Sequence, residues 1–351
     1  MPDASLQQHA PGSPRVIVAG ATGFAGALAA HLLWRHPQFE LVAVTARSEL
    51  GRPLCALYPR YRVPLALELL EPERLAGIDA AVVAYPHAAA APTVGELRER
   101  GIRVVDLSAD FRLRSLANYE QWYGEHPRAD LLGEAVYGLT ELHREAIAGA
   151  DIVANPGCYP TASLLALAPL ARAGLIADLV IDAKQGISGA GRVFDETTHL
   201  SMAGENIVPY KVAAHRHTPE IEEQLALLAP TAGDRHKPLA VQFQAHLVPL
   251  DEGELASCYV TTTRPVGAAE LRELYTRAYA HEPFVELLLS GPPGVLEVRE
   301  TNYCRVFAAA DAHTGKVIAF GAIDNLWKGT SSQAVQNLNV MFGLPETAGL
   351  Q

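Results

Sequence analysis

The apolar residues are distributed differently in the two halves of the chain, and each half predicts its own kind of sheet. In the first half, short continuous apolar runs alternate with helical stretches. The runs cover residues 16–19, 41–44, 80–84, 104–107 and 152–154. Strands that are apolar throughout are typical of a parallel sheet buried on both faces. The first half is therefore predicted to be an α/β domain with a Rossmann-type parallel sheet.

The second half shows period-two alternation instead. In residues 241–250, Val241, Phe243 and Ala245 alternate with polar residues. Further strands are expected at 255–263 and, joined by a turn, within 304–323, with helices at 161–173, 218–228 and 267–280. This alternation predicts an antiparallel sheet with one covered face, and hence a second domain of the α+β class.

The length of 351 residues fits two domains of about 150 residues each. Residues 1–13 are expected to form a flexible arm, 14–156 the dinucleotide-binding domain and 157–325 the catalytic α+β domain. Residues 326–351 are expected to contain a C-terminal helix that packs back on the first domain.

Charge and cysteine content narrow the possible partners. Lys and Arg number 28 against 39 Asp and Glu, a formal charge of −11, which argues against nucleic-acid or membrane binding. No apolar run approaches the length of a membrane span, residues 1–14 do not form a secretory signal, and none of the four cysteines lies in a CxxC pair. A cytoplasmic protein with reduced thiols is expected.

The first candidate motif is GATGFAG, Gly20–Gly26, which directly follows a predicted strand and opens a helix. Such a unit presents backbone N–H groups and the positive end of a helix to a pyrophosphate. The alternative is a tight turn without a ligand. The position of the motif, in the first strand–helix unit of an α/β domain, favours dinucleotide binding.

The end of the second strand indicates which dinucleotide. NAD sites usually place an acidic residue there for the ribose hydroxyl. This chain has Thr45, Arg47 and Ser48 instead. An arginine pairs with a 2′-phosphate and hydroxyl groups donate to it, so NADP is predicted. The alternative for Arg47 is an ordinary surface residue.

The third motif, ANPGCYPTA, places Cys158 just ahead of a helix expected to begin near Pro160 or Thr161. The positive end of that helix is expected to lower the pKa of the thiol, and its N–H groups to stabilise an oxyanion. Cys158 is thus a candidate nucleophile, although a lone cysteine is more often a small core residue.

Two histidines, His215 and His217, precede the helix expected at 218–228. No companion ligand stands at a metal-like spacing, so no metal is predicted. A histidine opposite a nucleophilic cysteine is the usual general acid or base. Glu220, one turn into the helix, is a candidate to orient a histidine. The alternative is a solvated polar loop.

Two further segments carry local positive charge. KQGISGAGR contains Lys184, Ser188, Gly189 and Arg192 and offers many donors to an oxyanion. In DLSADFR, Arg112 follows a predicted strand end, where α/β proteins place ligand contacts.

These motifs together resemble the family of N-acetyl-γ-glutamyl-phosphate reductases, the NADPH-dependent enzymes of arginine biosynthesis. The resemblance extends over about residues 15–344 and keeps the order of the motifs. They are GATGFAG, DLSADFR, NPGCYPTA, SGAGR, HRHTPEIE, DNLWKG and QAVQNLNVMFG. The family is similar in fold to aspartate-semialdehyde dehydrogenase and, more distantly, to glyceraldehyde-3-phosphate dehydrogenase.

The resemblance implies reduction of an acyl phosphate to a semialdehyde through a thioester, in a homo-oligomer, either dimer or tetramer. It implies that Cys158 is the nucleophile and His217 the better acid/base candidate. Glu220 is counted as a third catalytic residue because of its place one turn into the helix. The expected cofactor contacts are Gly20, Thr22, Gly23, Phe24, Gly26, Thr45, Arg47, Ser48, Ser188, Gly189 and Asn325. The expected substrate contacts are Arg112, Asn155, Lys184, Ser188, Arg192 and His215.

Three alternative functions stay open at this point. The AYPHAAA and MAGENIVPYK segments depart from the family pattern, so an aminoadipyl-phosphate reductase of lysine biosynthesis is the nearest alternative. A cysteine hydrolase on a Rossmann-like scaffold would use Cys158 and His217 without nicotinamide. A nucleotide-sensing regulator would perform no chemistry at all.

Overall fold

The computed structural model describes residues 12–192, 198–230 and 239–350. The chain divides into two compact units, residues 1–156 with 330–351, and residues 157–329. Most of the expected N-terminal arm, residues 1–11, lies outside the described residues. None of the helices in the described ranges is both long enough and apolar enough to span a bilayer.

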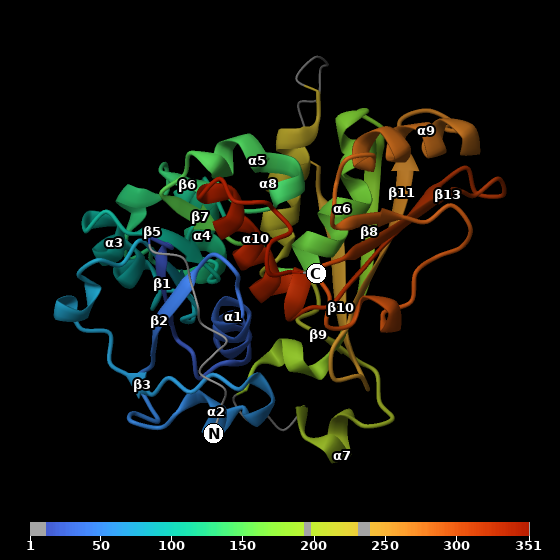
Figure 1. Cartoon of the computed structure of the whole chain (residues 1–351). Coiled ribbons are helices and arrows are strands. Elements are labelled where there is room, and N and C mark those ends of the chain that lie inside the picture. The colour runs from blue at the N-terminus through green and yellow to red at the C-terminus, as the bar shows by residue number, and fades with distance from the viewer. Residues whose placement is uncertain (1–11, 193–197, 231–238, 351) are drawn as a thin grey trace. The chain divides into compact units, whose positions relative to one another are not determined.

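Unit 1 is built on a seven-stranded sheet in which every strand pair is parallel (Figure 1). The strand order is β3-β2-β1-β4-β5-β7-β6. The strands are β1 (Arg15–Ala19), β2 (Glu40–Thr45), β3 (Leu67–Glu68), β4 (Ala80–Val83), β5 (Arg103–Asp106), β6 (Ala135–Tyr137) and β7 (Ile152–Ala154). The predicted parallel, doubly covered sheet is confirmed, because the central strands are buried along nearly their whole length.

Helices cover both faces of this sheet. They are α1 (Phe24–Trp34), α2 (Leu54–Leu57), α3 (Ala91–Glu99), α4 (Leu116–Tyr123), α5 (Thr140–Ala148) and α10 (Ser332–Met341). Val94 and Leu97 of α3 join a core with Ile17 and Val104 from the sheet. Helix α10 packs against α1 and α5, so the C-terminal helix belongs to unit 1.

Unit 2 contains a second seven-stranded sheet, in the order β12-β13-β14-β11-β8-β10-β9. Its strands are β8 (Ile176–Gly186), β9 (Val208–Tyr210), β10 (Val241–Val248), β11 (Glu254–Thr262), β12 (Val285–Leu287), β13 (Cys304–Ala310) and β14 (Val317–Ile323). The pairs β8–β10 and β12–β13 are parallel and the others antiparallel. The predicted antiparallel pairing therefore holds for four of the six strand pairs, and the two parallel pairs make the sheet mixed.

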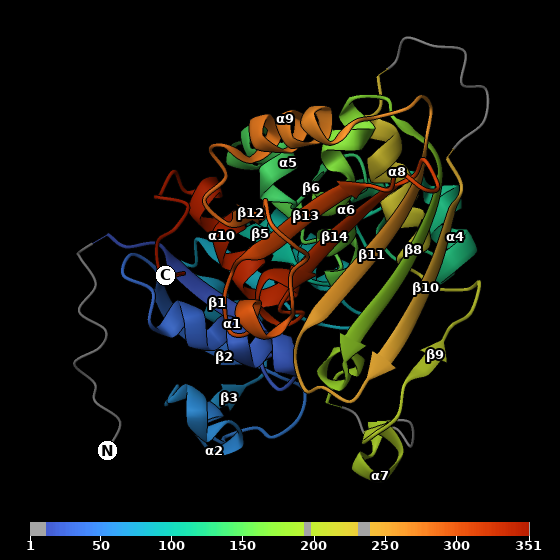
Figure 2. The same cartoon turned by 90° about the vertical axis from the view of Figure 1, so that its right-hand side faces the viewer.

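One face of the unit 2 sheet is covered by helices. The helices of this unit are α6 (Cys158–Arg172), α7 (Leu200–Ala203), α8 (Thr218–Leu228) and α9 (Ala268–Tyr279). Helix α6 lies across β11, β14 and β13, and a Cβ at Gly321 would come within 2.2 Å of the Ala162 carbonyl oxygen, so glycine is needed for this close approach. Figure 2 looks onto the opposite face, whose side chains are partly exposed.

Candidate active site

The nucleophile candidate is the first residue of α6. Gly157 is the N-cap and Cys158 begins the helix, whereas the sequence predicts a start two or three residues later. The residue is half-buried. The side-chain amide of Gln185, on β8, donates to the Cys158 Sγ at 3.0 Å. The thiol therefore lies in unit 2 between the start of α6 and the covered face of the sheet.

The electrostatics of Cys158 differ from the expectation. Burial, and next the Glu254 carboxylate, raise the pKa of the Cys158 thiol well above its usual range. The Gln185 amide and the Tyr159 N–H lower it by smaller amounts. The prediction of a lowered pKa is therefore wrong for the protein without substrate, because loss of hydration outweighs the helix end.

Two glycines leave room for this arrangement. A Cβ at Gly189 would come within 2.4 Å of the Gln185 side-chain amide, and a Cβ at Gly329 within 2.9 Å of the Cys158 Cβ. Gly329 closes the DNLWKG segment, and its N–H donates to the Asp324 carbonyl. An alanine at either position would displace the nucleophile or the amide that binds it.

The two histidines lie in the same unit, beside Tyr159. His217 is the N-cap of α8 and its ring lies 5.8 Å from the Tyr159 ring, centroid to centroid, while His215 lies 5.4 Å from it. His215 is buried, and burial, with a contribution from Lys211, lowers its pKa to about 3. His215 is therefore neutral at physiological pH, and its Nδ1 accepts the His217 backbone N–H at 3.2 Å.

Glu220 binds the backbone next to the nucleophile. Its Oε1 accepts the N–H of Gly157 at 2.9 Å, and the side chain is almost fully buried. Glu220 thereby fixes the residue immediately before Cys158. Its expected part in orienting a histidine stays a prediction.

The 187–190 segment forms a single 3-10 turn after β8. The Ser188 hydroxyl donates to the Asp251 carbonyl at 2.7 Å and accepts from the Asn325 amide at 3.0 Å. Asn325 also accepts the N–H of Gly253 at 2.8 Å. These contacts hold three loops of unit 2 together, and Arg192 is exposed just beyond them.

In the Gly20–Gly26 turn of unit 1, the backbone geometry requires glycine at two positions. Gly20 has φ +94°, and a Cβ on Gly26 would come within 2.3 Å of the Gly20 carbonyl oxygen. A Cβ on Gly23, by contrast, would meet nothing closer than 3.9 Å. Gly23 is the N-cap of α1 and has no side-chain cap. The turn therefore keeps the start of α1 open, which fits a dinucleotide pyrophosphate.

The DLSADFR segment is chiefly a buried network in unit 1. Asp106 accepts from the Ser108 N–H and hydroxyl, at 3.0 and 2.6 Å, and burial raises its pKa to about 7. Asp110 accepts from the Tyr119 hydroxyl at 2.8 Å and from the N–H of Ala91, the first residue of α3. The network thus positions the loop that carries Arg112.

Arg112 and Asn155 occupy neighbouring strand ends of unit 1. The Arg112 Nε donates to the Asn155 carbonyl at 2.8 Å, and Nη2 donates to the Leu107 carbonyl at 2.7 Å. The Asn155 side chain bonds to Thr330 and to Asn337 of α10. Both residues are buried, and their expected contacts with substrate stay predictions.

The comparisons with known proteins cover nearly the whole chain. Residues 15–150 match the family model "Semialdehyde dehydrogenase, NAD binding domain", and residues 158–325 match "Semialdehyde dehydrogenase, dimerisation domain". The N-acetyl-gamma-glutamyl-phosphate reductase of Moorella thermoacetica is 47% identical over 341 residues, 95% of this chain and 97% of the relative. That of Desulforudis audaxviator is 49% identical over 346 residues, 96% and 97% of the two chains.

The chain belongs to the family of N-acetyl-γ-glutamyl-phosphate reductases. A solved structure, aspartate semialdehyde dehydrogenase II of Vibrio cholerae, matches with a TM-score of 0.72 at 19% identity, over 94% of this chain and 98% of that one. This likeness confirms the predicted fold class. Membership in the reductase family confirms an NADP-dependent oxidoreductase of amino-acid biosynthesis. Relatives with this name do not favour the aminoadipyl or hydrolase alternatives.

Two of the residues expected to bind ligands in this reductase, Lys184 and Thr45, are already engaged in contacts within the protein. Lys184 pairs with Asp182 at 2.5 Å. Successive residues of a strand point to opposite faces, so Lys184 lies on the face away from Gln185 and Cys158, and its expected substrate contact stays a prediction. Thr45 is 3% exposed and its hydroxyl is buried. Its backbone carbonyl accepts the N–H groups of Gly20 and Ala21, and its expected contact with NADP stays a prediction.

Of the other expected NADP contacts in unit 1, those at the start of α1 other than Gly20 and Gly26 are half-buried, and those after β2 are exposed. Arg47 is exposed and lies 4.9 Å over the Tyr85 ring, and Ser48 is exposed beside it. Thr22 and Phe24 flank Gly23, and the Tyr58 hydroxyl donates to the Thr22 carbonyl at 2.8 Å. These positions suit a cofactor, and the contacts themselves stay predictions.

Sequence reasoning did not identify Gln185 or Glu254 as site residues of the reductase. Both are polar residues on the covered, apolar face of the sheet, in line with Ala183 and Ala256. A buried polar side chain among apolar neighbours is the signal that reveals them.

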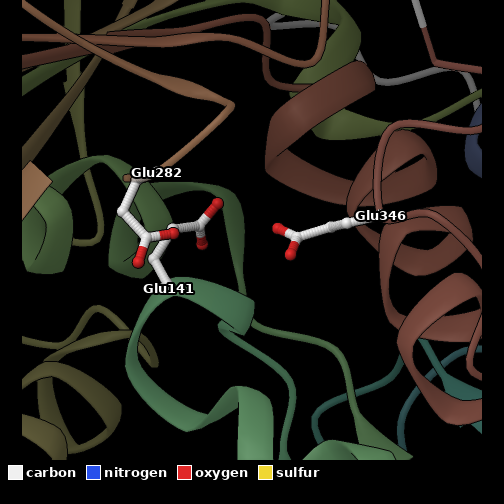
Figure 3. A group of neighbouring side chains, drawn as sticks. All are labelled: Glu141, Glu282 and Glu346. Atoms are coloured by element: carbon white, nitrogen blue, oxygen red, sulfur yellow. The ribbon is translucent and has the colours of Figure 1, made fainter. Parts of the chain in front are cut away.

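Acidic side chains also gather in unit 1, at Glu141 of α5 and Glu346 after α10 (Figure 3). Both accept from the Gln336 amide, at 3.1 and 2.8 Å, and Glu346 pairs with Arg144 at 2.8 Å. Because Gln336 and Arg144 already bind these carboxylates, we assign no metal to Glu141 and Glu346.

Proposed function

We propose that this protein reduces N-acetyl-γ-glutamyl phosphate to N-acetylglutamate semialdehyde and phosphate through a thioester on Cys158. The observation that carries the proposal is the position of Cys158 in a chain of this family. It opens α6 with the Gln185 amide 3.0 Å from its sulfur. Hydrogen bonds of this kind stabilise a thiolate.

In the first half-reaction the Cys158 thiolate attacks the γ-carbonyl carbon and forms a C–S bond. The resulting oxyanion collapses and expels phosphate, which leaves the thioester. The N–H groups of Cys158 and Tyr159 lie at the start of α6, where the positive end of the helix is suited to stabilise the oxyanion.

NADPH, when bound, would supply the hydride for reduction of the thioester. His217 is proposed to protonate the oxygen of the reduced adduct and to take that proton back when the C–S bond breaks and the semialdehyde leaves. His215 is less suited to this exchange because its pKa is lowered to about 3. Glu220 contributes by fixing Gly157.

The ligand contacts are divided between two groups of residues. For NADPH we propose the Gly20–Gly26 turn, Arg47 and Ser48 of unit 1, with Ser188, Gly189 and Asn325 of unit 2. For the anionic substrate we propose Arg112, Asn155, Ser188, Arg192 and His215. Arg112 and Arg192 supply the positive charge that an acyl phosphate requires.

The test is phosphate-dependent NADP reduction with N-acetylglutamate semialdehyde, run beside the aminoadipate analogue. The wild-type protein should favour the first substrate. Cys158→Ser replaces a thiol with a far less acidic hydroxyl, so turnover should fall by about three orders of magnitude while NADPH binding is retained. Substantial turnover by the serine variant would exclude the thioester route.

We also propose that unit 2 mediates self-association through the open face of its sheet. The matched family model is a dimerisation domain. The face carries Phe307 and Phe320, whose rings stack at 6.4 Å, and Tyr259, which is 38% exposed. Partly exposed apolar side chains in neighbouring strands suit a protein interface. Light scattering on wild type and Tyr259→Asp would distinguish a dimer from a tetramer and reveal whether this face holds the subunits together.

A further inference from the structure

Glu254, the first residue of β11, is a fully buried carboxyl group without an ordinary partner. Its exposed fraction is 0%, and no N–H or O–H group of the described residues donates to either carboxylate oxygen. Buried carboxylates usually have such donors, because an unpaired charge loses its hydration without compensation. A carboxyl group in such surroundings favours its protonated form.

The register of the sheet brings Glu254 to the nucleophile. Glu254 lies directly opposite Gln185 in the β11–β8 pair, and directly opposite residues point to the same face of a sheet. Gln185 contacts the Cys158 sulfur at 3.0 Å. Glu254 therefore faces α6 from the strand next to Gln185, on the side of the sheet where the Cys158 sulfur lies.

The backbone before Glu254 is fixed from both sides. The N–H of Gly253 donates to the Asn325 side chain at 2.8 Å, and the N–H of Gly186 donates to the Gly253 carbonyl at 2.9 Å. Gly253 has φ +121°, and a Cβ there would come within 2.9 Å of Val295. The carboxyl is thus held beside the thiol by the strand, and a rigid position is what a proton-transfer partner needs.

We propose that Glu254 is a further catalytic residue, which accepts the thiol proton of Cys158 when the nucleophile forms. This inference rests on the covalent route of the proposed function. The S–H bond breaks and an O–H bond forms, so thiol and carboxylate become thiolate and carboxylic acid without change of net charge. When the semialdehyde leaves, the released thiolate takes the proton back.

The electrostatics of the pair agree with a shared proton. Burial raises the pKa of Glu254 to about 8, and the Cys158 thiol lowers it by a smaller amount. The carboxylate in turn raises the pKa of the thiol. The other titratable groups around the pair are Tyr159 on α6, Tyr210 on β9, Asp324 after β14, Glu220 on α8 and the histidines His215 and His217.

A proton shared between Cys158 and Glu254 would change how the fraction of Cys158 thiolate depends on pH. Above about pH 8 the pair has lost one proton, and the remaining proton is divided between sulfur and oxygen in a fixed ratio. The fraction of thiolate should therefore rise with pH to about 8 and then level off. With glutamine at position 254 only the thiol ionises, so its thiolate fraction should keep rising about tenfold per pH unit.

The experiment measures the rate constant for alkylation of Cys158 by iodoacetamide from pH 6 to 10, followed by peptide mass spectrometry. The wild-type rate should level off near pH 8, and that of Glu254→Gln should not. The ratio of variant to wild type should grow about tenfold from pH 8 to 9. Glu254→Asp keeps the acid and should restore the levelling.

The matched control is Glu222→Gln on α8. Burial also raises the pKa of Glu222, but its Oε1 accepts the Val241 N–H at 2.8 Å, a contact that glutamine retains. This variant should follow the wild-type profile. The proposal is overturned if wild type and Glu254→Gln give the same profile, whether both rates level off near pH 8 or neither does.

Alkylation requires neither substrate nor NADPH. If the protein fails to reduce N-acetyl-γ-glutamyl phosphate, the proposed function fails while the alkylation profiles still decide the role of Glu254. If turnover is present and the profiles coincide, only the role of Glu254 fails.

Discussion

The hydrogen bond from Gln185 to the Cys158 sulfur gives the most direct prediction for the nucleophile. The two atoms lie 3.0 Å apart, and Gln185 is 2% exposed. Gln185→Leu removes the donor and leaves a side chain of similar size, so the fold is expected to survive. What changes is the stabilisation of the sulfur anion.

The size of the effect follows from the charge on the acceptor. A hydrogen bond to a charged group contributes about 1.5–3 kcal/mol. At about 1.36 kcal/mol per pKa unit, losing it raises the pKa of the Cys158 thiol by about 1–2 units. At a fixed pH below that pKa, the thiolate fraction and hence kcat/KM should fall about 10- to 150-fold.

The measurement compares kcat/KM and iodoacetamide labelling of Cys158 at pH 7.5, in wild type and Gln185→Leu. Both quantities should fall by the same factor, because both depend on the thiolate. Gln244→Leu is the control, since the Gln244 amide donates to the Ala245 carbonyl on β10 and lies off the covered face. Unchanged labelling in Gln185→Leu would show that the 3.0 Å contact does not stabilise the thiolate.

Two further predictions concern unit 1. Arg47→Ala should weaken NADPH binding by about 1.5–3 kcal/mol and leave NADH binding nearly unchanged, measured by fluorescence titration; equal losses would assign Arg47 to the loop and not to the 2′-phosphate. The pKa of Asp106 is raised to about 7 by burial, so the folded state holds a proton that the unfolded chain releases near pH 4. This contribution to stability falls as pH rises from about 4 to 7, by up to about 4 kcal/mol. In urea unfolding, Asp106→Asn should therefore gain stability relative to wild type across that range, and a constant difference would contradict the assignment.

The strands of unit 1 were predictable because they are buried on both faces. The runs at 41–44 and 104–107 correspond to β2 and β5 within one residue at each end. A continuous apolar run has few other interpretations in a chain with helical stretches between the runs.

The direction of the strands in unit 2 was not predictable from alternation. Period two arises in any strand with one covered face, whether its neighbour runs parallel or antiparallel. Strand β10 alternates as expected and still pairs in parallel with β8, because α7, β9 and α8 separate the two along the chain. Connection length was the better guide to strand direction.

The sequence predicted the site residue that lies in a local motif. It did not predict the site residues that only the pairing of two strands brings close to it. NPGCYPTA made Cys158 a candidate, because Pro160 and Thr161 mark a helix start beside it. Gln185 and Glu254 lie 27 and 96 positions further along the chain, counted from Cys158 as 185 − 158 and 254 − 158. Only the pairing of β8 with β11 brings them to one place.

The pKa of Cys158 shows which of two opposing effects is larger. A helix N-terminus contributes about 0.3–1 kcal/mol to an adjacent anion at an exposed position, and up to about 2 kcal/mol in partly buried geometries. Desolvation of a buried group shifts its pKa by up to several units, at about 1.36 kcal/mol each. Burial and the Glu254 carboxylate therefore outweigh the start of α6, and the thiol holds its proton in the free protein. A nucleophile that is protonated at rest needs an acceptor within reach of its sulfur at the moment of attack. Among the described residues of unit 2, we propose Glu254 for this part, because it is buried directly opposite Gln185, whose amide contacts the sulfur.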